Sequence, residues 1–539
     1  MESYKLACHL KSYIQPFERT LAIKELKVLA GNMPIAQLGQ NNEPIDYTIL
    51  SSKPYRYLAD RLTYWESVTS EAETIPSLLT RQVCREATTN LVRNGISSEQ
   101  LKKLLPFHDQ VPLENRRNLR YGSHGIHEYR GKFFPQLVRS LLNIANTTPK
   151  SKVLDPMCGS GTTPTEAILL GCQAYGVDLN PLSVLVSQVK CNILSVSPER
   201  LVSEYKTLKE DLLNLSHNQK SNLVWLKSLE LKTQEYLSDW FSPEIMEQLD
   251  SIMVRINQVA EPACRNLFKV SLSNIIRNVS WQKNDDLRVR REIRTDIDID
   301  VLAEFLDELN RSVKTILALL YENQSSEVGN AQIVQGNTQF ADRLFPDLVG
   351  QVDTIITSPP YATALPYLDT DRLSLYYLNL LPRSEHRRLD YDMIGNREVT
   401  NSIRKLYWEE YQNNRFKLTN DIVSTIDLIH NLNSNSDVGF RRLNLPSLLA
   451  RYFFNMKQVF ETFTKLLRPG ASAYVVVGNN HTIAGGQRIE IETDKLLAQL
   501  GEAVGFKLEE QISMEMLGAR DIFKKNAGNA ETILFFRNG

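Results

Sequence analysis

Short apolar runs alternate with a helix-like stretch between residues 151 and 181. The sequence SKVLDPMCGSGTT begins with a β-branched run and ends in an aspartate and glycines, TEAILLGC has helical spacing, and QAYGVDLNP is a second run that ends in an aspartate. Apolar runs of this length, bounded by glycine, aspartate or proline, are typical of strands. The pattern predicts a strand, a helix and a second strand in succession.

Two further apolar runs lie later in the chain. Residues 351–357 (QVDTIIT) break off at a Ser-Pro-Pro sequence, and residues 471–478 (ASAYVVVG) follow the helix-ending sequence LRPG. Strands that alternate with helices predict an α/β fold with a doubly wound sheet. In such a sheet the functional site lies at the carboxyl ends of the strands.

Three stretches fall outside this alternation. Residues 1–105 have a mixed helical pattern, as in LTRQVCREATTNLVRNGI, and residues 197–330 are helical and charged. Residues 364–444 are rich in Tyr, Arg and Asn. Inserts of this length usually form subdomains, and loops on the functional face often carry substrate contacts. We expect the first stretch to be a helical accessory or dimerisation region.

Composition excludes several classes of protein. The chain has 539 residues with 62 Lys and Arg against 63 Asp and Glu, so any polyanion must bind a local basic patch. The six cysteines are scattered without CxxC pairs, which argues against a zinc or thioredoxin-like site. No apolar run approaches the roughly 18 residues that cross a bilayer, and charges interrupt the first segment. We expect a soluble cytoplasmic protein.

The glycine-rich turn DPMCGSGTT is the first candidate ligand site. Gly159 and Gly161 let the backbone turn tightly at the start of a helix, where a dinucleotide, a phosphate or S-adenosylmethionine can bind. No Lys follows in a G-K-[ST] arrangement, which argues against a phosphate-binding P-loop. Asp178 ends the next strand and can accept both hydrogens of a ribose diol. These features favour an adenosine-containing ligand.

The sequence TSPPY supplies a second chemistry. Its two prolines fix the backbone, so that the carbonyl groups of Ser358 and Pro359 can point outward as acceptors, while Tyr361 offers a face for stacking a planar base. A ring-conjugated amino group is a poor nucleophile, and accepting its hydrogens localises the nitrogen lone pair for attack on a methyl group. Taken alone, S-P-P-Y is also compatible with a simple turn after a strand.

Together these motifs resemble those of the DNA amino-methyltransferases that modify cytosine N4 or adenine N6. DPMCGSGTT is similar to motif I of that family, VDLNP to motif II, QGNTQF to motif III, TSPPY to the catalytic motif IV, and HEYRGKFFPQLVRSLL to motif X. The resemblance implies a Rossmann-like methyltransferase fold with a mixed sheet, and S-adenosylmethionine as the cofactor. It implies no metal and no cysteine nucleophile.

The resemblance also assigns candidate site residues. The catalytic residues it implies are Ser358, Pro359, Pro360 and Tyr361. The cofactor-binding residues it implies are Lys132, Phe133, Pro135, Asp155, Pro156, Cys158, Gly159, Gly161, Thr162, Asp178, Asn180 and Asn337. For Cys158 a packing role within the cofactor turn is more plausible than a catalytic one.

The identity of the target base rests on one position. Within the family S-P-P-Y is typical of cytosine-N4 enzymes, whereas adenine-N6 enzymes mostly carry an acidic residue or Asn at the position of Ser358. We therefore expect a flipped cytosine, stacked on Tyr361, to be methylated at N4. Three alternatives stay open: an adenine-N6 enzyme, an RNA methyltransferase of the tRNA guanosine-N2 type, and a cofactor-binding module without catalysis.

The predicted organisation places a methyltransferase core around two inserts. Its units are a helical accessory region (1–105), the cofactor half of the core (106–196), a helical insert that is a candidate DNA-binding region (197–330), the catalytic part of the core (331–365), an insert that is a candidate for target recognition (366–445), and the C-terminal part of the core (446–539). The implied partner is double-stranded DNA, with any restriction or defence protein on a separate chain. Candidate DNA contacts are Arg288, Arg290, Arg291, Arg387 and Arg388, although a solvated helix face or ion-pair network explains such clusters equally well.

Overall fold

The structure is a computed structural model. It describes residues 4–38, 46–91, 120–129, 131, 134–214, 222–283, 290–293, 299–324, 327–362, 367–396, 399–515 and 530–539. Among the helices in these ranges, none is both long and apolar enough to span a membrane.

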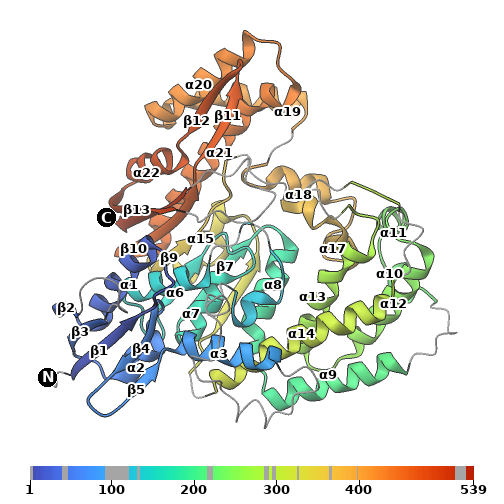
Figure 1. The fold of residues 1–539 in the computed structure, drawn as a ribbon. Coiled ribbons are helices and arrows are strands. Elements are labelled where there is room, and N and C mark those ends of the chain that lie inside the picture. Colours follow the sequence, from blue (N-terminus) through green and yellow to red (C-terminus); the bar gives the residue numbers. More distant parts are fainter. Residues whose placement is uncertain are drawn as a thin grey trace.

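A seven-stranded sheet forms the centre of the molecule (Figure 1). Its strands, in spatial order, are β13 (Phe506–Glu515), β14 (Ala530–Asn538), β10 (Leu467–Gly478), β9 (Val352–Thr357), β6 (Lys152–Asp155), β7 (Gln173–Asp178) and β8 (Ala331–Gln335). The strands from β10 to β8 pair in parallel, and β14 is antiparallel to both of its neighbours. The predicted α/β fold with a doubly wound mixed sheet is confirmed.

Alternating residues of the central strands divide the core into two layers. In β9, Ile356 belongs to the apolar cluster on one face of the sheet and Ile355 to the cluster on the other. The first face carries α6 (Pro135–Ile144), α7 (Thr162–Leu169) and α8 (Pro181–Asn192), and the second carries α15 (Ala341–Leu344), α21 (Phe440–Leu466) and α22 (Thr493–Ala503). This period of two is the expected consequence of the pleat in strands buried on both sides.

The described residues among the first 76 correct the sequence prediction. They form a five-stranded antiparallel sheet in the order β2 (Ile35–Leu38), β3 (Asp46–Ser51), β1 (Tyr4–Leu10), β4 (Trp65–Thr69) and β5 (Thr74–Pro76), with α1 (Pro16–Leu29) and α2 (Tyr55–Arg61) beside it. The expectation of a helical region was wrong here, because β1 and β3 bury every second residue, a pattern with the period of a strand. A helix predicted near residues 79–96 is present as α3 (Leu78–Leu91).

The first long insert is helical, as predicted. It contains α9 (Pro198–Leu213), α10 (Val224–Ser228), α11 (Leu231–Ser238), α12 (Pro243–Gln258), α13 (Pro262–Val279) and α14 (Val301–Glu322). The long helix α14 packs against α13, α9 and α3, and α13 packs against α8 of the core. The bundle therefore extends the core on the side of α8 (Figure 1).

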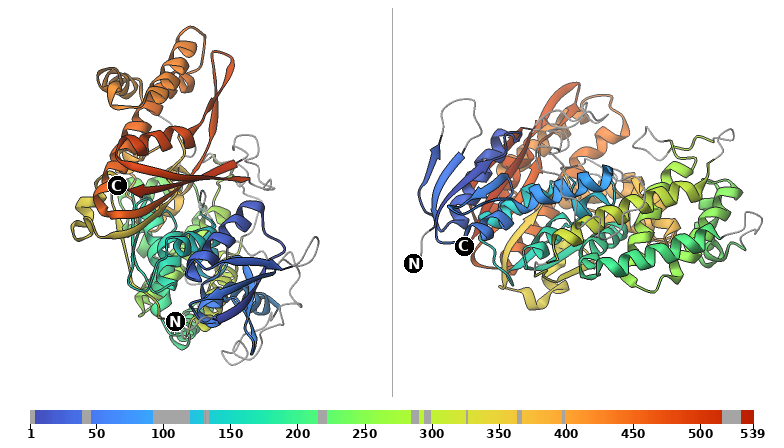
Figure 2. Two further views of the ribbon diagram at one scale, coloured as in Figure 1. Left: turned by 90° about the vertical axis from the view of Figure 1, so that its left-hand side faces the viewer. Right: turned by 60° about the horizontal axis from the view of Figure 1, so that its bottom comes forward.

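The second insert divides between two neighbourhoods. Its first helices are α16 (Tyr367–Thr370), α17 (Arg372–Tyr377) and α18 (His386–Asp392). Of these, α17 contacts α8 of the core and α11 and α13 of the first insert. Its later helices, α19 (Asn401–Asn414) and α20 (Asn420–Ser434), pack on α21, and α20 also contacts the hairpin of β11 (Asn480–Ala484) and β12 (Gln487–Ile491). We call α19, α20, β11 and β12 the arm, which projects from the sheet (Figures 1 and 2).

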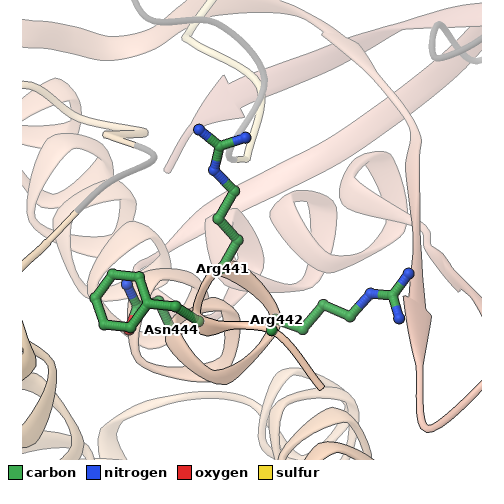
Figure 3. A pocket seen from close by; sticks show the side chains of 5 residues that line it. Arg441, Arg442 and Asn444 are labelled. Atoms are coloured by element: carbon green, nitrogen blue, oxygen red, sulfur yellow. The ribbon is translucent and has the colours of Figure 1, made fainter. Parts of the chain in front are cut away.

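A hollow lies at the far end of the arm, where α21 begins beside the turn of the β11–β12 hairpin. It is lined by Gly439, Phe440, Arg441, Arg442 and Asn444, and the side chains of its two arginines point in different directions (Figure 3). None of the predicted cofactor or catalytic residues lines this hollow.

Candidate active site

The glycine turn after β6 is required by the packing of two helices. Gly161 is the N-cap of α7 with φ of 79°, a left-handed conformation that favours glycine. A Cβ at this position would lie 2.3 Å from Oγ of Ser187 and 2.8 Å from its Cα, on α8. The glycine therefore lets α7 and α8 approach each other directly beneath the turn.

Gly159 brings the same turn against Tyr129. Its φ is 48°, and a Cβ here would lie 3.1 Å from Cε1 of the Tyr129 ring. The hydroxyl of Ser183 donates a hydrogen bond of 2.9 Å to Tyr129 Oη, which fixes the ring beside the turn. Tyr129 was not predicted as a site residue, although it lies in the HEYRGKFF segment that the sequence comparison with motif X singles out.

Asp178 organises the carboxyl end of β7. One carboxylate oxygen accepts the N–H of Gly159 at 2.8 Å, and the other accepts the N–H of Asn180 at 2.8 Å. Burial raises the pKa of Asp178 to about 6, against the lowering effect of these backbone hydrogen bonds. Asn180 caps α8 by accepting the N–H of Leu182, and its amide donates to Asp371 at the start of α17.

Asp155 lies deeper, at the carboxyl end of β6. It is fully buried, and one of its carboxylate oxygens accepts the N–H of Met157 at 3.2 Å. Burial raises the pKa of Asp155 to about 7, although the hydroxyl groups of Thr357 and Thr163 lower it. The side chain therefore supports the turn from within the core.

A cavity joins the glycine turn after β6 to the loop Ser358–Tyr361, which we call the SPPY loop. It is lined by Tyr129, Gly131, Pro156, Met157, Gly159, Asp178, Leu179, Gly336, Asn337, Thr338, Ser358, Pro360, Asp392, Met393 and Ile394. The carboxyl ends of β7, β8 and β9 meet here, which is the edge where ligands bind in doubly wound sheets. Residues from motifs that are far apart in the chain thus share one cavity.

The predicted site residues fall into three groups. Pro156, Gly159, Asp178, Asn337, Ser358 and Pro360 line the cavity. Pro135, Asp155, Cys158, Gly161, Thr162, Asn180, Pro359 and Tyr361 are not among its lining residues, and most of them are buried around it. Lys132 and Phe133 lie outside the described residues.

The SPPY loop is tied to the neighbouring strand β10 and its extension. The hydroxyl of Ser358 donates a hydrogen bond of 3.0 Å to the carbonyl oxygen of Val476. At the other end of the loop, the side-chain amide of Asn480 donates to the carbonyl oxygen of Ala362, also at 3.0 Å. These two bonds hold the loop at both of its ends, and together with the fixed φ angles of the two prolines they restrict its conformations.

The second insert closes the cavity in a way that the motifs did not indicate. One wall is formed by Asp392, the last residue of α18, and by Met393 and Ile394, which follow it. The next residue, Gly395, has φ of 81°, and a Cβ there would lie 3.3 Å from both Cβ of Pro360 and the carbonyl oxygen of Tyr361. The insert therefore packs directly on the SPPY loop.

The candidate DNA-binding arginines lie at two places. Arg290 and Arg291 are exposed, and Arg291 donates to the carbonyl oxygen of Asp239 at 2.9 Å; Arg288 lies outside the described residues. Arg387 and Arg388 are exposed on α18, whose last residue, Asp392, lines the cavity. Since α-helices rise about 1.5 Å per residue, this second pair lies within roughly 8 Å of that wall along the helix axis.

Comparisons with known proteins find methyltransferases of similar sequence. A family profile described as "RMKL-like, methyltransferase domain" matches residues 127–198, the stretch that holds Tyr129, the glycine turn and Asp178. The type II methyltransferase M.MvaI of Kocuria varians is 25% identical over 427 residues, which cover 75% of this chain and 86% of that protein. M.BsoBI of Geobacillus stearothermophilus is 22% identical over 445 residues, covering 75% of this chain and 84% of its own.

The solved structure of TrmN from Thermus thermophilus covers 99% of this chain and 100% of its own, with 9% sequence identity and a TM-score of 0.32. A similarity this low adds nothing to the fold assignment, which rests on the strand order and the helices on both faces of the sheet. The sequence similarity to M.MvaI and to M.BsoBI, in contrast, covers 75% of this chain in each case. The chain is similar in sequence to type II methyltransferases over 75% of its length, and its doubly wound mixed sheet is Rossmann-like.

Proposed function

We propose that this chain is an S-adenosylmethionine-dependent DNA methyltransferase that modifies an exocyclic amino group, with cytosine N4 as the target. One observation carries the proposal: a single cavity is lined by Asp178 at the end of β7 and by Ser358 at the end of β9. A carboxylate suited to binding ribose and one acceptor for a base amine, Ser358, thus face the same space. The sequence similarity to the type II methyltransferases M.MvaI and M.BsoBI supports a site-specific enzyme acting on DNA.

The cavity fits the cofactor in two respects. The backbone at Gly159 approaches the cavity without a side chain, and Asp178 offers a carboxylate that can accept ribose hydroxyl groups. Asn337 and Thr338 line the same cavity beyond β8 and would also contact a bound cofactor. When bound, the cofactor supplies a methyl group on a positively charged sulfur.

The SPPY loop is suited to receiving a base amine. Because the hydroxyl hydrogen of Ser358 is directed to the carbonyl oxygen of Val476, the lone pairs of Ser358 Oγ remain available as acceptors. The carbonyl group of Pro359 is restricted by the fixed φ angles of Pro359 and Pro360, and it would accept the second amine hydrogen. Accepting both hydrogens localises the nitrogen lone pair, and holding the two reactants together provides much of the rate.

A flipped base requires a stacking surface, and Tyr361 supplies it in this proposal. Extruding the base from the duplex costs a few kcal/mol, which stacking and pocket contacts must offset. The six cysteines are all buried, and burial raises the pKa of Cys158 well above its ordinary value. A cysteine nucleophile therefore has no part in the proposed mechanism.

The DNA would lie across the face that carries the cavity. The predicted division of labour, with residues 197–330 in DNA binding and residues 366–445 in target recognition, is part of the proposal. Arg387 and Arg388 are its best-placed phosphate contacts, since their helix ends at the cavity wall. Arg291 is the weaker candidate, because its guanidinium already donates to Asp239.

The experiment is nucleoside mass analysis of DNA from cells expressing this chain. A Pro359→Ala, Tyr361→Ala double variant should leave no mark, and the matched control Pro346→Ala changes an exposed proline outside the cavity. N4-methylcytosine that depends on the intact loop would support the whole proposal. N6-methyladenine would refute the choice of base alone, and an unmarked DNA together with methylated RNA would refute DNA as the substrate.

A further inference from the structure

The ring of Tyr361 contacts two residues, Glu531 and Gly478, that none of the sequence motifs includes. Its hydroxyl donates a hydrogen bond to Oε1 of Glu531, on β14. Glu531 lies directly opposite Gly478 in the antiparallel pairing of β14 with β10. The three residues therefore meet where β10 ends, although Tyr361 and Glu531 are 170 positions apart in the chain.

Gly478 provides the space for the ring. A Cβ at this position would lie 2.7 Å from Cε2 and 3.1 Å from Cζ of Tyr361, closer than side-chain carbons normally approach. The neighbouring β10 residues Val475, Val476 and Val477 are β-branched, so the glycine interrupts a run with strong strand preference. Glycine lowers the stability of a strand, and it is needed here because the ring lies against the backbone.

Glu531 fixes the rotation of the same ring. Burial raises the pKa of Glu531, and the hydrogen bond from Tyr361 lowers it, so the tyrosine hydroxyl stabilises the ionised carboxylate. A hydrogen bond to a charged group is roughly twice as strong as one between neutral groups. One ring edge is thus anchored by its hydroxyl, and one ring face rests on Gly478.

Neither Tyr361 nor Glu531 lines the cavity that contains Asp178. A change in their contact should therefore alter the presentation of the target base and leave the cofactor region intact. This separation distinguishes a role in positioning the base from a general role in folding the site.

We infer that Glu531 and Gly478 are positioning residues that fix the plane of Tyr361 for stacking of the flipped base, an inference that rests on the proposed function. Glu531 acts through the hydroxyl of Tyr361, and Gly478 acts by leaving room for its ring. Losing the hydrogen bond to Glu531 frees the ring to rotate, and a side chain at position 478 displaces it. In both cases stacked bases present their amino group to Ser358 less often.

The test compares Tyr361→Phe, Glu531→Leu, Glu531→Gln and Gly478→Ala with the wild type on unmethylated genomic DNA. Tyr361→Phe and Glu531→Leu should each lower kcat about tenfold or more, the range expected for losing a hydrogen bond to a charged group. The kcat of the Tyr361→Phe, Glu531→Leu double variant should be no lower than that of the slower single variant, because both changes remove the same hydrogen bond. Gly478→Ala should lower kcat by a similar or larger factor.

Two comparisons separate positioning from folding. Glu531→Gln keeps an acceptor oxygen and should stay within about threefold of the wild type, as should the control Glu509→Leu, which breaks an exposed ion pair with Arg537 on the same hairpin. The Kd for S-adenosylmethionine and the Tm should be unchanged in Tyr361→Phe and Glu531→Leu. A loss of kcat accompanied by an equal loss of cofactor binding would overturn the positioning role.

Fluorine NMR of protein labelled with 3-fluorotyrosine reports on the contact without any DNA. The Tyr361 resonance is identified by its absence from Tyr361→Phe, and it should shift in Glu531→Leu and stay in place in Glu509→Leu. An unmoved resonance in Glu531→Leu would overturn the contact itself. If the wild type methylates DNA and Tyr361→Phe and Glu531→Leu do so with an unchanged kcat, the positioning role alone is overturned. If the wild type methylates no DNA, the proposed function and the positioning role are overturned together.

Discussion

Asp178→Asn should weaken cofactor binding and remove its dependence on pH between about 5 and 7. In the wild type, both carboxylate oxygens already accept a backbone N–H, and burial raises the pKa of Asp178 to about 6 from its ordinary 3.8. A ribose diol needs acceptors, so the ionised form is the one that binds. At pH 5 only about a tenth of the side chains are ionised, and the apparent Kd should rise about tenfold relative to pH 7.5.

The asparagine keeps one acceptor and replaces the other with an amide donor, which would face a backbone N–H or a ribose hydroxyl. Losing a hydrogen bond to a charged group costs roughly 1.5 to 3 kcal/mol, which corresponds to a Kd about 10 to 150 times higher at pH 7.5. Isothermal titration calorimetry with S-adenosylmethionine from pH 5 to pH 8 measures both effects.

The matched control is Asp342→Asn, which removes an acidic partner of Lys465 outside the cavity and should leave the pH profile unchanged. Asp155 also titrates near this range, with a pKa of about 7, but it does not line the cavity, so its protonation should leave the Kd for the cofactor unchanged. A wild-type Kd that is constant from pH 5 to pH 7.5, or a pH dependence that survives in Asp178→Asn, would refute the assignment of Asp178 to the ribose.

Three further predictions test other parts of the structure. Burial raises the pKa of Asp155 to about 7, so the folded chain keeps a proton that the unfolded chain loses near pH 4. Through this group the free energy of unfolding should fall by about 2 to 3 kcal/mol from pH 5 to pH 7.5. Urea titrations of Asp155→Asn should lack this decrease of the unfolding free energy with pH. Arg139→Ala leaves the fully buried Glu166, 3.1 Å from Arg139 Nη1, without its guanidinium partner and should cost about 3 to 5 kcal/mol in thermal unfolding; a Tm within 2 °C or so of the wild type would contradict this. Replacing both Arg387 and Arg388 with Ala should weaken DNA binding and reduce the slope of log Kd against log salt concentration by about 2, and an unchanged slope in salt-dependent binding assays would remove them from the interface.

Local patterns in the sequence were sufficient to predict the centre of the fold. The strands around residues 151–181 and 351–357 are marked by their own apolar runs and by the aspartate, glycine or proline that ends each of them. Ser358 and Asp178 share the cavity because parallel strands bring their carboxyl ends to one edge, a rule that needs no knowledge of the side chains between them.

The N-terminal sheet was missed because its signal is short and its pairing is distant. β2 has four residues and β5 has three, too few for alternation to stand out beside α1 and α3. The order of the strands, in which β1 lies between β3 and β4, depends on contacts up to about 60 positions apart. Helical stretches of 14 residues repeat their pattern several times and therefore dominated the prediction.

The support of the SPPY loop could not have been predicted, because it depends on strand register. Val476, Gly478 and Asn480 contact Ser358, Tyr361 and Ala362 respectively, so every second residue along one stretch of chain meets the loop. Successive residues of a strand face opposite sides, and a shift of one residue would turn all three contacts away together. The parallel pairing of β10 with β9 and the antiparallel pairing with β14 set this register, and the second also places Glu531 opposite Gly478. The geometry of the loop is therefore specified by long-range pairing, whereas its chemistry is specified by five consecutive residues.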